Sequence, residues 1–276
     1  MRRTTPVNEA WLNAVSNLSS FGKEASARGL CFKEIIGGSI QCDMTRSALS
    51  VISRKIGFRF MVAEAWWIMS GKNDLRSIEK YSKAIGKFSD DGLFFFGSYG
   101  PKVIDQLPYV ISALKQDPGS RRAVINIWRE KPTDSSDYPC TLSVQWLIRD
   151  NLLMCLDTMR SSDIWLGTPY DLFNFSCLSA FLLLSLRAID PRFKEIELGQ
   201  IIMTCGSQHL YDINYTQAIE VLSKPEAIKY APLDLAEFVS PWDFLDNLEM
   251  LKDRKDSGHK WLRELLIESK EPHPGQ

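Results

Sequence analysis

One of the six cysteines stands in a setting that suits nucleophilic catalysis. Cys140 follows Pro139 at the head of a predicted strand, and arginines lie about twenty residues away on both sides: Arg121 and Arg122 before it, and Arg160 after it. Positive charge nearby lowers the pKa of a thiol from about 8.5 and so increases the fraction of reactive thiolate. A small core residue is the alternative, since buried cysteines are common, and the two adjacent arginines could equally be solvated after a turn.

Three further side chains are of types that move protons or bind polar ligands. Glu64 interrupts the apolar helical stretch MVAEAWWIM, where burial would raise its pKa and suit it to proton transfer. His209 lies in GSQHLY, and Asp171 precedes an apolar helix in GTPYDLFNF. Each also has a structural interpretation: a paired acid, a hydrogen-bonded core histidine and a helix N-cap. A thiol hydrolase built from Cys140, His209 and a carboxylate is one functional hypothesis at this point.

Composition narrows the class of protein. The 276 residues are 45% hydrophobic and 24% charged with a net charge of −1, which is ordinary for a folded domain and argues against general nucleic-acid binding. The cysteines form no C-x-x-C pair and only three histidines are present, so we predict no metal site. No secretory signal is visible and the longest apolar run, residues 173–186, is too short to span a bilayer. We therefore expect a cytoplasmic protein with free thiols and no membrane contact.

The elements that must position these side chains follow from hydrophobic spacing. We predict helices over residues 8–29, 58–69, 102–116 and 170–187, and a helical tail from Pro241 that frays at about 268–276. Strands are expected in KEIIGGSIQCD with a bend at the double glycine, in RRAVINIW, in a hairpin around the RDN tip, and in GQIIMTCGSQHLY. Together they predict a single α+β domain over 1–276, with a mostly antiparallel or mixed sheet packed with helices.

Several short motifs follow one another in a recognisable order. They are E-x-W-W, G-S-Y-G, D-P-G-S-R-R, P-C-T, M-R-S-S-D-x-x-L-G-x-P and H-L-Y. Over roughly residues 30–215 their order, spacing and residue types resemble the thymidylate synthase family. The resemblance implies folate-dependent one-carbon transfer to a pyrimidine nucleotide, in a symmetric homodimer that forms through the sheet. It also argues against the thiol hydrolase, because acyl transfer has no use for four phosphate-binding cations.

The resemblance gives the side chains at the reacting atoms their roles. The Cys140 thiolate would add to C6 of the pyrimidine and make C5 nucleophilic. Arg160 would lower the pKa of the thiol and would hold a phosphate oxygen together with Ser161. Glu64 would organise water and move protons, and Tyr99 would assist at C5.

The resemblance also implies how the two substrates are held. Arg121 and Arg122 would complete the phosphate clamp from the partner subunit, and Arg28 is a candidate fourth phosphate arginine. His209 and Tyr211 would bind the 3′-hydroxyl of the sugar. The co-substrate would be 5,10-methylenetetrahydrofolate, whose pterin would contact three residues: Asp163, Leu166 and Gly167. No metal is implied.

Three departures from the synthase pattern point to a different member of the superfamily. Thr141 follows the nucleophile where synthases carry histidine, and Asp171 stands where uracil-using relatives have asparagine. The end of the chain also lacks the apolar, valine-containing segment that seals a synthase site. Asp171, the Cys-Thr pair, the GS-x-H-x-Y pattern and KEIIGGS near the start resemble the deoxycytidylate hydroxymethylases of phages, whose product would serve DNA modification.

Asp171 carries the choice of base. Cytosine presents an N3 acceptor and an N4 amino donor, whereas uracil presents N3–H and O4. A carboxyl group can accept from N4 and share a proton with N3, while an amide would leave buried groups unpaired at a cost of about 1–3 kcal/mol each. We therefore expect hydroxymethylation of dCMP or CMP by water attack on a C5 methylene. The alternatives are methylation by hydride transfer from the folate, and a uracil-specific enzyme.

Overall fold

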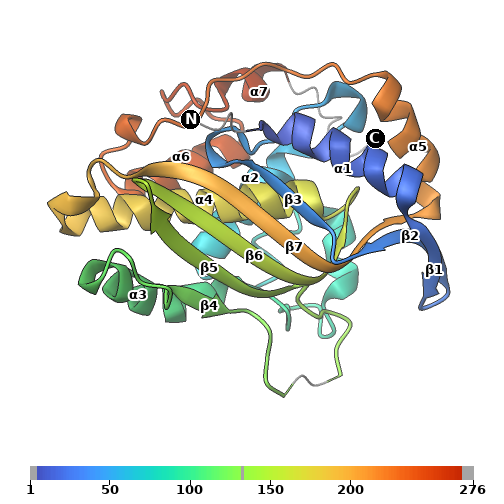
Figure 1. Cartoon of the computed structure of the whole chain (residues 1–276), viewed down its shortest axis with the longest axis horizontal. Coiled ribbons are helices and arrows are strands. Elements are labelled where there is room, and N and C mark those ends of the chain that lie inside the picture. Colours follow the sequence, from blue (N-terminus) through green and yellow to red (C-terminus); the bar gives the residue numbers. More distant parts are fainter. Residues whose placement is uncertain (1–4, 132–133, 269–276) are drawn as a thin grey trace.

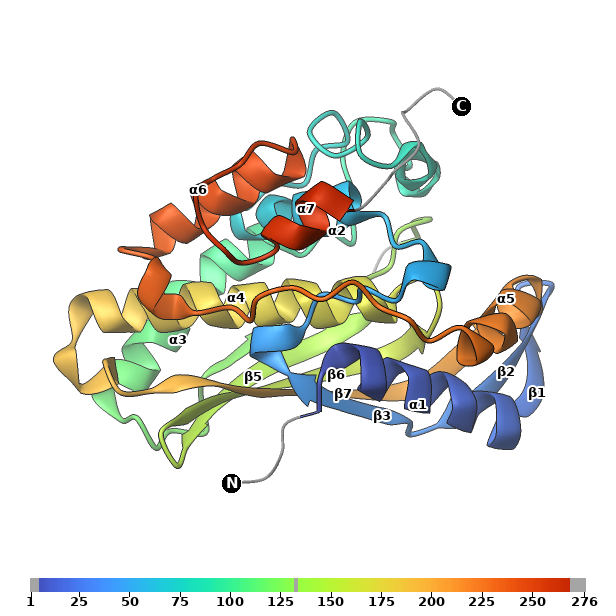
Figure 2. The same ribbon diagram turned by 90° about the horizontal axis from the view of Figure 1, so that it is seen from above.

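The described residues, 5–131 and 134–268 of a computed structural model, form a mixed sheet with helices packed on one face (Figures 1 and 2). The tail predicted to fray lies outside them except for residue 268. The strands are β1 (Lys23–Ala27), β2 (Leu30–Ile36), β3 (Ser39–Asp43), β4 (Val124–Asn126), β5 (Thr141–Arg149), β6 (Leu152–Asp163) and β7 (Glu197–Tyr211). The helices are α1 (Val7–Phe21), α2 (Phe58–Met69), α3 (Gly100–Gln116), α4 (Thr168–Ile189), α5 (Asp212–Ser223), α6 (Pro241–Lys252) and α7 (Arg263–Glu268).

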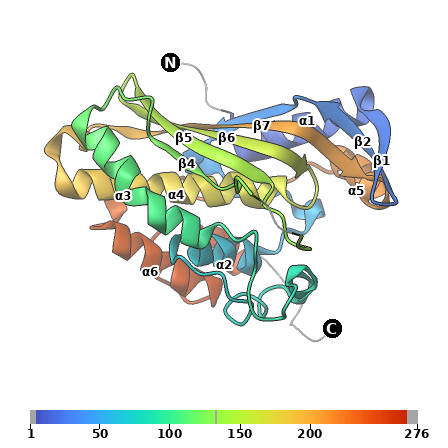
Figure 3. The ribbon, with the colours of Figure 1, turned by 90° about the horizontal axis from the view of Figure 1, so that it is seen from below.

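The strand order is β1-β2-β7-β6-β5-β4, with β3 also paired to β7. Only β6 and β7 run parallel among these pairs, so the sheet is mixed and the α+β class is as predicted. Seen from below, α2, α3, α4 and α6 all lie on the same side of the sheet (Figure 3). Figure 1 looks onto the opposite face of β5, β6 and β7, which none of the described helices covers.

The β5–β6 hairpin turns where the sequence predicts it. Asp150 and Asn151 have φ values of 52° and 58°, the left-handed conformation that a two-residue hairpin turn requires at both positions. Arg149 pairs with Leu152 across this turn. The short polar side chains of Asp and Asn tolerate that conformation better than other side chains do, so the RDN tip sets the register of both strands.

Helix α4 forms the centre of the core because it is apolar on nearly all sides. Most of its residues are buried, including Phe173, Phe175 and Leu182, as expected for a helix enclosed by a sheet and other helices. Its length and hydropathy would suffice to cross a membrane, but 78% of its most apolar window is buried inside the protein. Trp146 of β5 donates a hydrogen bond of 2.8 Å to Ser179, which fixes the helix against the sheet.

The helix predicted over 8–29 is wrong beyond Phe21. Residues 23–27 instead form β1, which pairs with β2 through a turn at Arg28 and Gly29. Gly22 ends the helix and donates its N–H to the Leu18 carbonyl, which lies too close to the Gly22 Cα to leave room for a side chain. The apolar spacing that suggested the helix also stops at Phe21, which is 76% exposed.

Two other strand predictions need smaller corrections. The double glycine separates two strands, β2 and β3, which both pair with β7, and Gly37 adopts a φ of 69° between them. In RRAVINIW only three residues form a strand, β4.

Further along β7, Gly206 lies so close to β6 that an added Cβ would meet the Arg160 carbonyl oxygen at 2.7 Å.

The hairpin turn gives a test of this architecture. Asn151→Val should lower the unfolding temperature by about 3–6 °C, because the left-handed conformation costs a residue with a branched Cβ about 1–2 kcal/mol. Asn151→Gly, which adopts that conformation freely, should melt within about 2 °C of the wild type. Thermal unfolding followed by circular dichroism makes the comparison, and equal melting of the two variants would contradict the assigned turn.

Candidate active site

The pairing of β5 with β6 brings Arg160 to Cys140. The Arg160 amide donates to the Cys140 carbonyl at 2.8 Å, and the guanidinium donates to the Pro139 and Tyr138 carbonyls at 2.9 and 3.1 Å. These bonds hold Arg160 Nη2 3.8 Å from the Cys140 sulfur, and Ser161 Oγ lies 4.0 Å from it. A half-buried thiol is thus held beside a fixed positive charge and a hydroxyl donor.

The net pKa of Cys140 is nevertheless raised above its usual value. Burial is the largest cause, and the nearby Asp171 carboxyl acts in the same direction. Arg160 acts in the opposite direction, as expected, but it does not outweigh burial. Arg160 thus favours the thiolate, as the resemblance implies, but the net effect in the chain without a ligand favours the protonated thiol.

A cleft of about 550 Å³ lies next to the thiol. It joins residues from both ends of the sheet, and it includes five of the residues predicted to bind the nucleotide. Its lining is Ala27, Arg28, Phe32, Glu34, Trp128, Tyr138, Arg160, Ser161, Ser207, His209 and Tyr211. The strand registers explain this meeting, because Ser161 pairs with Ser207 on β7 and His209 pairs with Glu34 on β2.

The end of this cleft formed by β2 and β7 is built from rings and one carboxylate. The His209 ring lies edge-on to Tyr211 at 5.0 Å between centroids, and Arg28 Nη2 is 3.5 Å from the Tyr211 hydroxyl. Glu34 accepts a 2.6 Å hydrogen bond from Ser207. Sequence reasoning assigned no role to Glu34, although this residue lies in the KEIIGGS segment of a predicted strand.

Two aromatic residues that sequence analysis did not single out form the wall of the cleft beside Arg160. The rings of Trp128 and Tyr138 stack at 6.3 Å between centroids, and the Arg160 guanidinium lies 6.0 Å from the Trp128 ring. Flat aromatic surfaces beside a guanidinium restrict its motion and exclude water from one side of the cleft. No sequence signal distinguished these two rings from ordinary core aromatics.

Arg121 and Arg122 are not brought to Cys140 of their own chain. Both are exposed and precede β4, where the Gln145 side chain donates a 2.7 Å hydrogen bond to the Arg121 carbonyl. Gln145 is five residues along β5 from Cys140, a separation of about 16 Å along an extended strand. The backbone of these two arginines therefore lies well along the strand from the thiol of the same chain.

Behind Cys140, acidic side chains meet in the space between the sheet and α4. Glu64 of α2 accepts a 2.8 Å hydrogen bond from Asn174, and burial raises its pKa to about 7 despite that bond. Burial also raises the pKa of Asp171 well above its usual value, and the nearby Glu64 carboxyl adds to the rise. Burial therefore favours the protonated form of both carboxyl groups behind the thiol.

Tyr99 connects these acids to the strand that carries the nucleophile. The Thr141 amide donates to the Tyr99 hydroxyl at 3.3 Å, and the Tyr99 ring stacks on Phe175 at 6.0 Å between centroids. Burial raises the pKa of Tyr99 well above its usual value, and the carboxyl of Asp171 contributes to that rise. Tyr99 is thus a neutral hydroxyl group at neutral pH, fixed beside Cys140 and Asp171.

The predicted pterin contacts cluster where β6 leads into α4. Asp163 Oδ1 accepts from the amides of Trp165 and Leu166 at 2.8 and 3.1 Å, and the Asp163 carbonyl accepts from Gly167 at 3.0 Å. Asp163 Oδ2 is buried and has no hydrogen-bond partner among the described residues. An unused carboxylate oxygen beside the exposed Leu166 fits a flat ligand that carries amino donors, as the pterin of the folate does.

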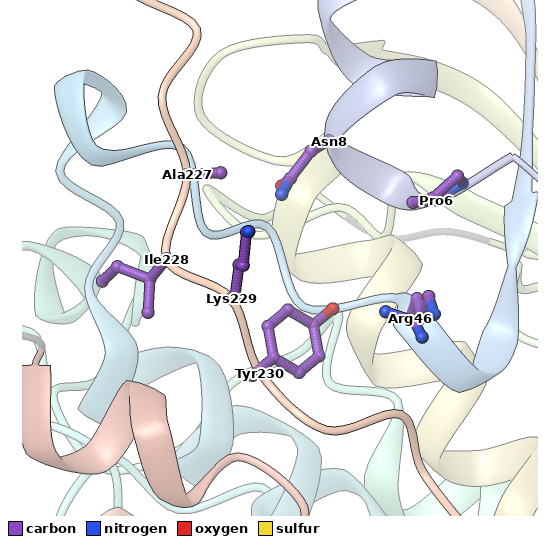
Figure 4. Close-up of a pocket in the computed structure, with 7 residues that line it drawn as sticks. All are labelled: Pro6, Asn8, Arg46, Ala227, Ile228, Lys229 and Tyr230. Atoms are coloured by element: carbon purple, nitrogen blue, oxygen red, sulfur yellow. The ribbon is translucent and has the colours of Figure 1, made fainter.

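Two other features bear on ligand binding. A second cleft, of about 630 Å³, is lined by residues that include Arg46, Lys229 and Tyr230 (Figure 4) and contains none of the predicted site residues. Among residues 5–131 and 134–268, no group of three His, Cys, Asp or Glu side chains is placed to hold a metal ion. The predicted chemistry is therefore concentrated around Cys140.

The opposing effects of Arg160 and of burial on the pKa of the Cys140 thiol can be tested by measuring how fast the thiol reacts. Arg160→Ala should raise the pKa of the thiol further and slow its alkylation at pH 7.5 by about tenfold, which corresponds to one pKa unit. Iodoacetamide labelling followed by mass spectrometry measures the rate, in a Cys31→Ser background that removes the exposed cysteine. Arg149→Ala, at the far end of β5, is the matched control, and equal slowing in both variants would contradict the pairing of Arg160 with the thiol.

The comparison with known families agrees with this geometry. A match to the family described as thymidylate synthase extends over residues 9–250. It includes all strands of the sheet, the nucleophile, the acids behind it and the turn after β6. Since the match covers most of the 276 residues, the chain belongs to the thymidylate synthase family.

Proposed function

We propose that this chain is a deoxycytidylate 5-hydroxymethyltransferase. It would transfer a one-carbon unit from 5,10-methylenetetrahydrofolate to C5 of dCMP or CMP through a covalent Cys140–C6 adduct, and water would trap the resulting methylene. Membership of the family supports the general part of this proposal, a folate-dependent one-carbon transfer to a pyrimidine nucleotide. The choice of cytosine and of water rests on this chain's own residues.

The observation that carries the proposal is the buried carboxyl group of Asp171. Burial raises its pKa and favours the protonated form, whose O–H can donate to N3 of cytosine while its carbonyl oxygen accepts from the N4 amino group. As the thiolate adds to C6, negative charge builds on the ring, and the same carboxyl can pass its proton to N3. An amide at this position has no proton acidic enough to transfer, which limits it to hydrogen bonding.

The other side chains have matching tasks. Arg160 and Ser161 would hold the nucleotide phosphate beside the thiol, while His209 and Tyr211 would hold the sugar. Glu64, with a pKa of about 7, can both accept and donate a proton at neutral pH, which suits a group that must serve several steps. Methylenetetrahydrofolate, held by the turn after β6, would supply the one-carbon unit.

A second copy of the chain would complete the phosphate clamp. On β6 the side chains that alternate with the buried ones, Met154 and Leu156, point to the open face, and Leu156 pairs with Ile202 of β7. All three are half-buried in the single chain. An open sheet face with apolar side chains favours packing on an identical face, which would deliver Arg121 and Arg122 to the partner's site.

The alternative reactions differ in their support. Methylation by hydride transfer and a uracil-specific reaction use the same nucleophile, so only product analysis separates them from hydroxymethylation. The thiol hydrolase is disfavoured, because the hydrogen-bond contacts of the Cys140 sulfur among the described residues are with Arg160 and Ser161. His209 Nδ1 instead lies 3.4 Å from the Ser207 carbonyl.

Asp171→Asn tests the choice of base. The variant should lose at least about 10²-fold in kcat/KM for dCMP, because an amide cannot give N3 a proton, and its relative use of dUMP should rise. Binding of dCMP, measured by calorimetry, should change little since the phosphate contacts remain. Mass analysis of the products from dCMP, CMP and dUMP identifies the reaction. A wild type that prefers dUMP, or an Asn variant as active on dCMP as the wild type, would overturn the assignment.

Complementation between two inactive chains tests the dimer. Cys140→Ser should abolish turnover, because an alcohol is a much poorer nucleophile than a thiolate at neutral pH, and Arg122→Ala should weaken the partner's phosphate clamp. A heterodimer of the two variants has one site with both lesions and one with neither. It should recover about half of the wild-type activity per dimer. Confirmed subunit exchange without recovery would place Arg122 in the site of its own chain.

A further inference from the structure

A carboxyl group that the proposed chemistry does not use lies in the middle of β6. Asp157 is 1% exposed, and neither of its side-chain oxygens has a hydrogen-bond partner among the described residues. Its strand neighbours are apolar, since it pairs with Val144 on β5 and with Met203 on β7, both fully buried. Burying a carboxyl group without partners is unfavourable, so its presence at this position calls for an explanation other than stability.

The polar groups that face Asp157 come from each element packed against it. Asp171 faces it from α4 and the Thr141 hydroxyl faces it from β5. The thiols of Cys205 on β7 and Cys155 on its own strand are also close enough for Asp157 to raise their pKa. None of these groups carries positive charge. Burial raises the pKa of Asp157 well above its usual value and Asp171 adds to this, so the protonated form of the carboxyl is favoured.

Both polar neighbours of Asp157 belong to the pyrimidine site. Asp171 is the carboxyl that we assign to the base, and Thr141 directly follows the nucleophile and donates its amide to Tyr99. The Thr141 hydroxyl is itself buried and has no partner among residues 5–131 and 134–268. The Glu64 carboxyl raises the pKa of Asp171, and the Asp171 carboxyl raises the pKa of Asp157, so three buried acids on α2, α4 and β6 influence one another in sequence.

We propose that Asp157 is a positioning residue that acts on the bound base through Asp171 and Thr141. When Asp171 passes its proton to N3, a buried carboxylate remains with no described cation beside it, and the Asp157 O–H donates a hydrogen bond to it. In the complex with the base, the second Asp157 oxygen would accept from the Thr141 hydroxyl, which would fix the residue next to Cys140. This inference rests on the proposed function, because it assigns Asp157 to the step in which cytosine is protonated.

The test compares stability with turnover in Asp157→Val. Valine suits a buried strand and removes the unpartnered oxygens, so the unfolding temperature should rise by about 3 °C. The kcat for dCMP should fall by at least about tenfold while the Kd for dCMP stays within about threefold of the wild type, because the phosphate and sugar contacts are unchanged. A purely structural aspartate predicts the reverse, a lower unfolding temperature and no separate loss of kcat.

Two further variants make the result specific. Asp157→Asn keeps a hydrogen-bond donor of the same size and should recover kcat to within about threefold of the wild type. Cys155→Val, on the same face of β6 two residues away, is the control for altered packing and should leave kcat unchanged.

The outcomes separate this inference from the proposed function. A wild type that prefers dCMP, together with wild-type kcat in Asp157→Val, would overturn the role of Asp157 alone. Loss of kcat that Asp157→Asn does not recover, with a lower unfolding temperature, would also overturn it. A wild type that prefers dUMP would overturn the proposed function and this inference with it.

Discussion

The register of the three central strands determines how the residues of the cleft lie relative to Cys140. Pairing of β5 with β6 sets Arg160 beside Cys140, and the parallel pairing of β6 with β7 sets Ser161 opposite Ser207 and Asp163 opposite His209. Side chains alternate between the two faces of a strand, so a shift of one residue would send each of these groups to the wrong face. The left-handed turn at Asp150 and Asn151 prevents that shift at the hairpin. The site is therefore a product of strand pairing more than of any one loop.

The face of the sheet that packs on α4 adjoins buried acids that have no described cation to balance their charge. Glu64, Asp157 and Asp171 are all buried, and burial raises the pKa of each one. No described cation neutralises these acids there, so burial favours their protonated forms. Arg160 lies on the other side of Cys140 and only partly opposes the effect of burial on the thiol. The nucleotide would thus enter between a cationic side that suits its phosphate and an acidic, proton-bearing side that suits its base.

Local patterns in the sequence predicted the parts of the fold that depend on neighbouring residues. The helix over 58–69 and the RDN hairpin are confirmed, because apolar spacing and turn chemistry are local properties. The helix over 8–29 was wrong because a glycine and a competing strand partner ended it at Phe21. The motifs identified the candidate residues around Cys140, but they assigned no role to Glu34 or Asn174. The hydrogen bonds of these two residues depend on how the strands and helices pair. The net pKa of Cys140 was not predictable either, since it depends on how deeply the thiol is buried. Asp157 had a weak signal, an acid that alternates with apolar residues in LLMCLDTMRS.

The close packing of β7 against β6 limits which residues can occupy position 206. A methyl group at that position would clash with the carbonyl oxygen of Arg160 on the adjacent strand. The amide of Arg160 is hydrogen-bonded to the carbonyl of Cys140, so a shift of Arg160 would reach the segment that carries the thiol. Two residues earlier on the same strand, Thr204 carries an exposed side chain in a single chain. Substitution along β7 is therefore limited unevenly: a side chain at position 206 would force β6 to shift, although the residue there takes no part in the chemistry and would be overlooked in a search for reactive groups.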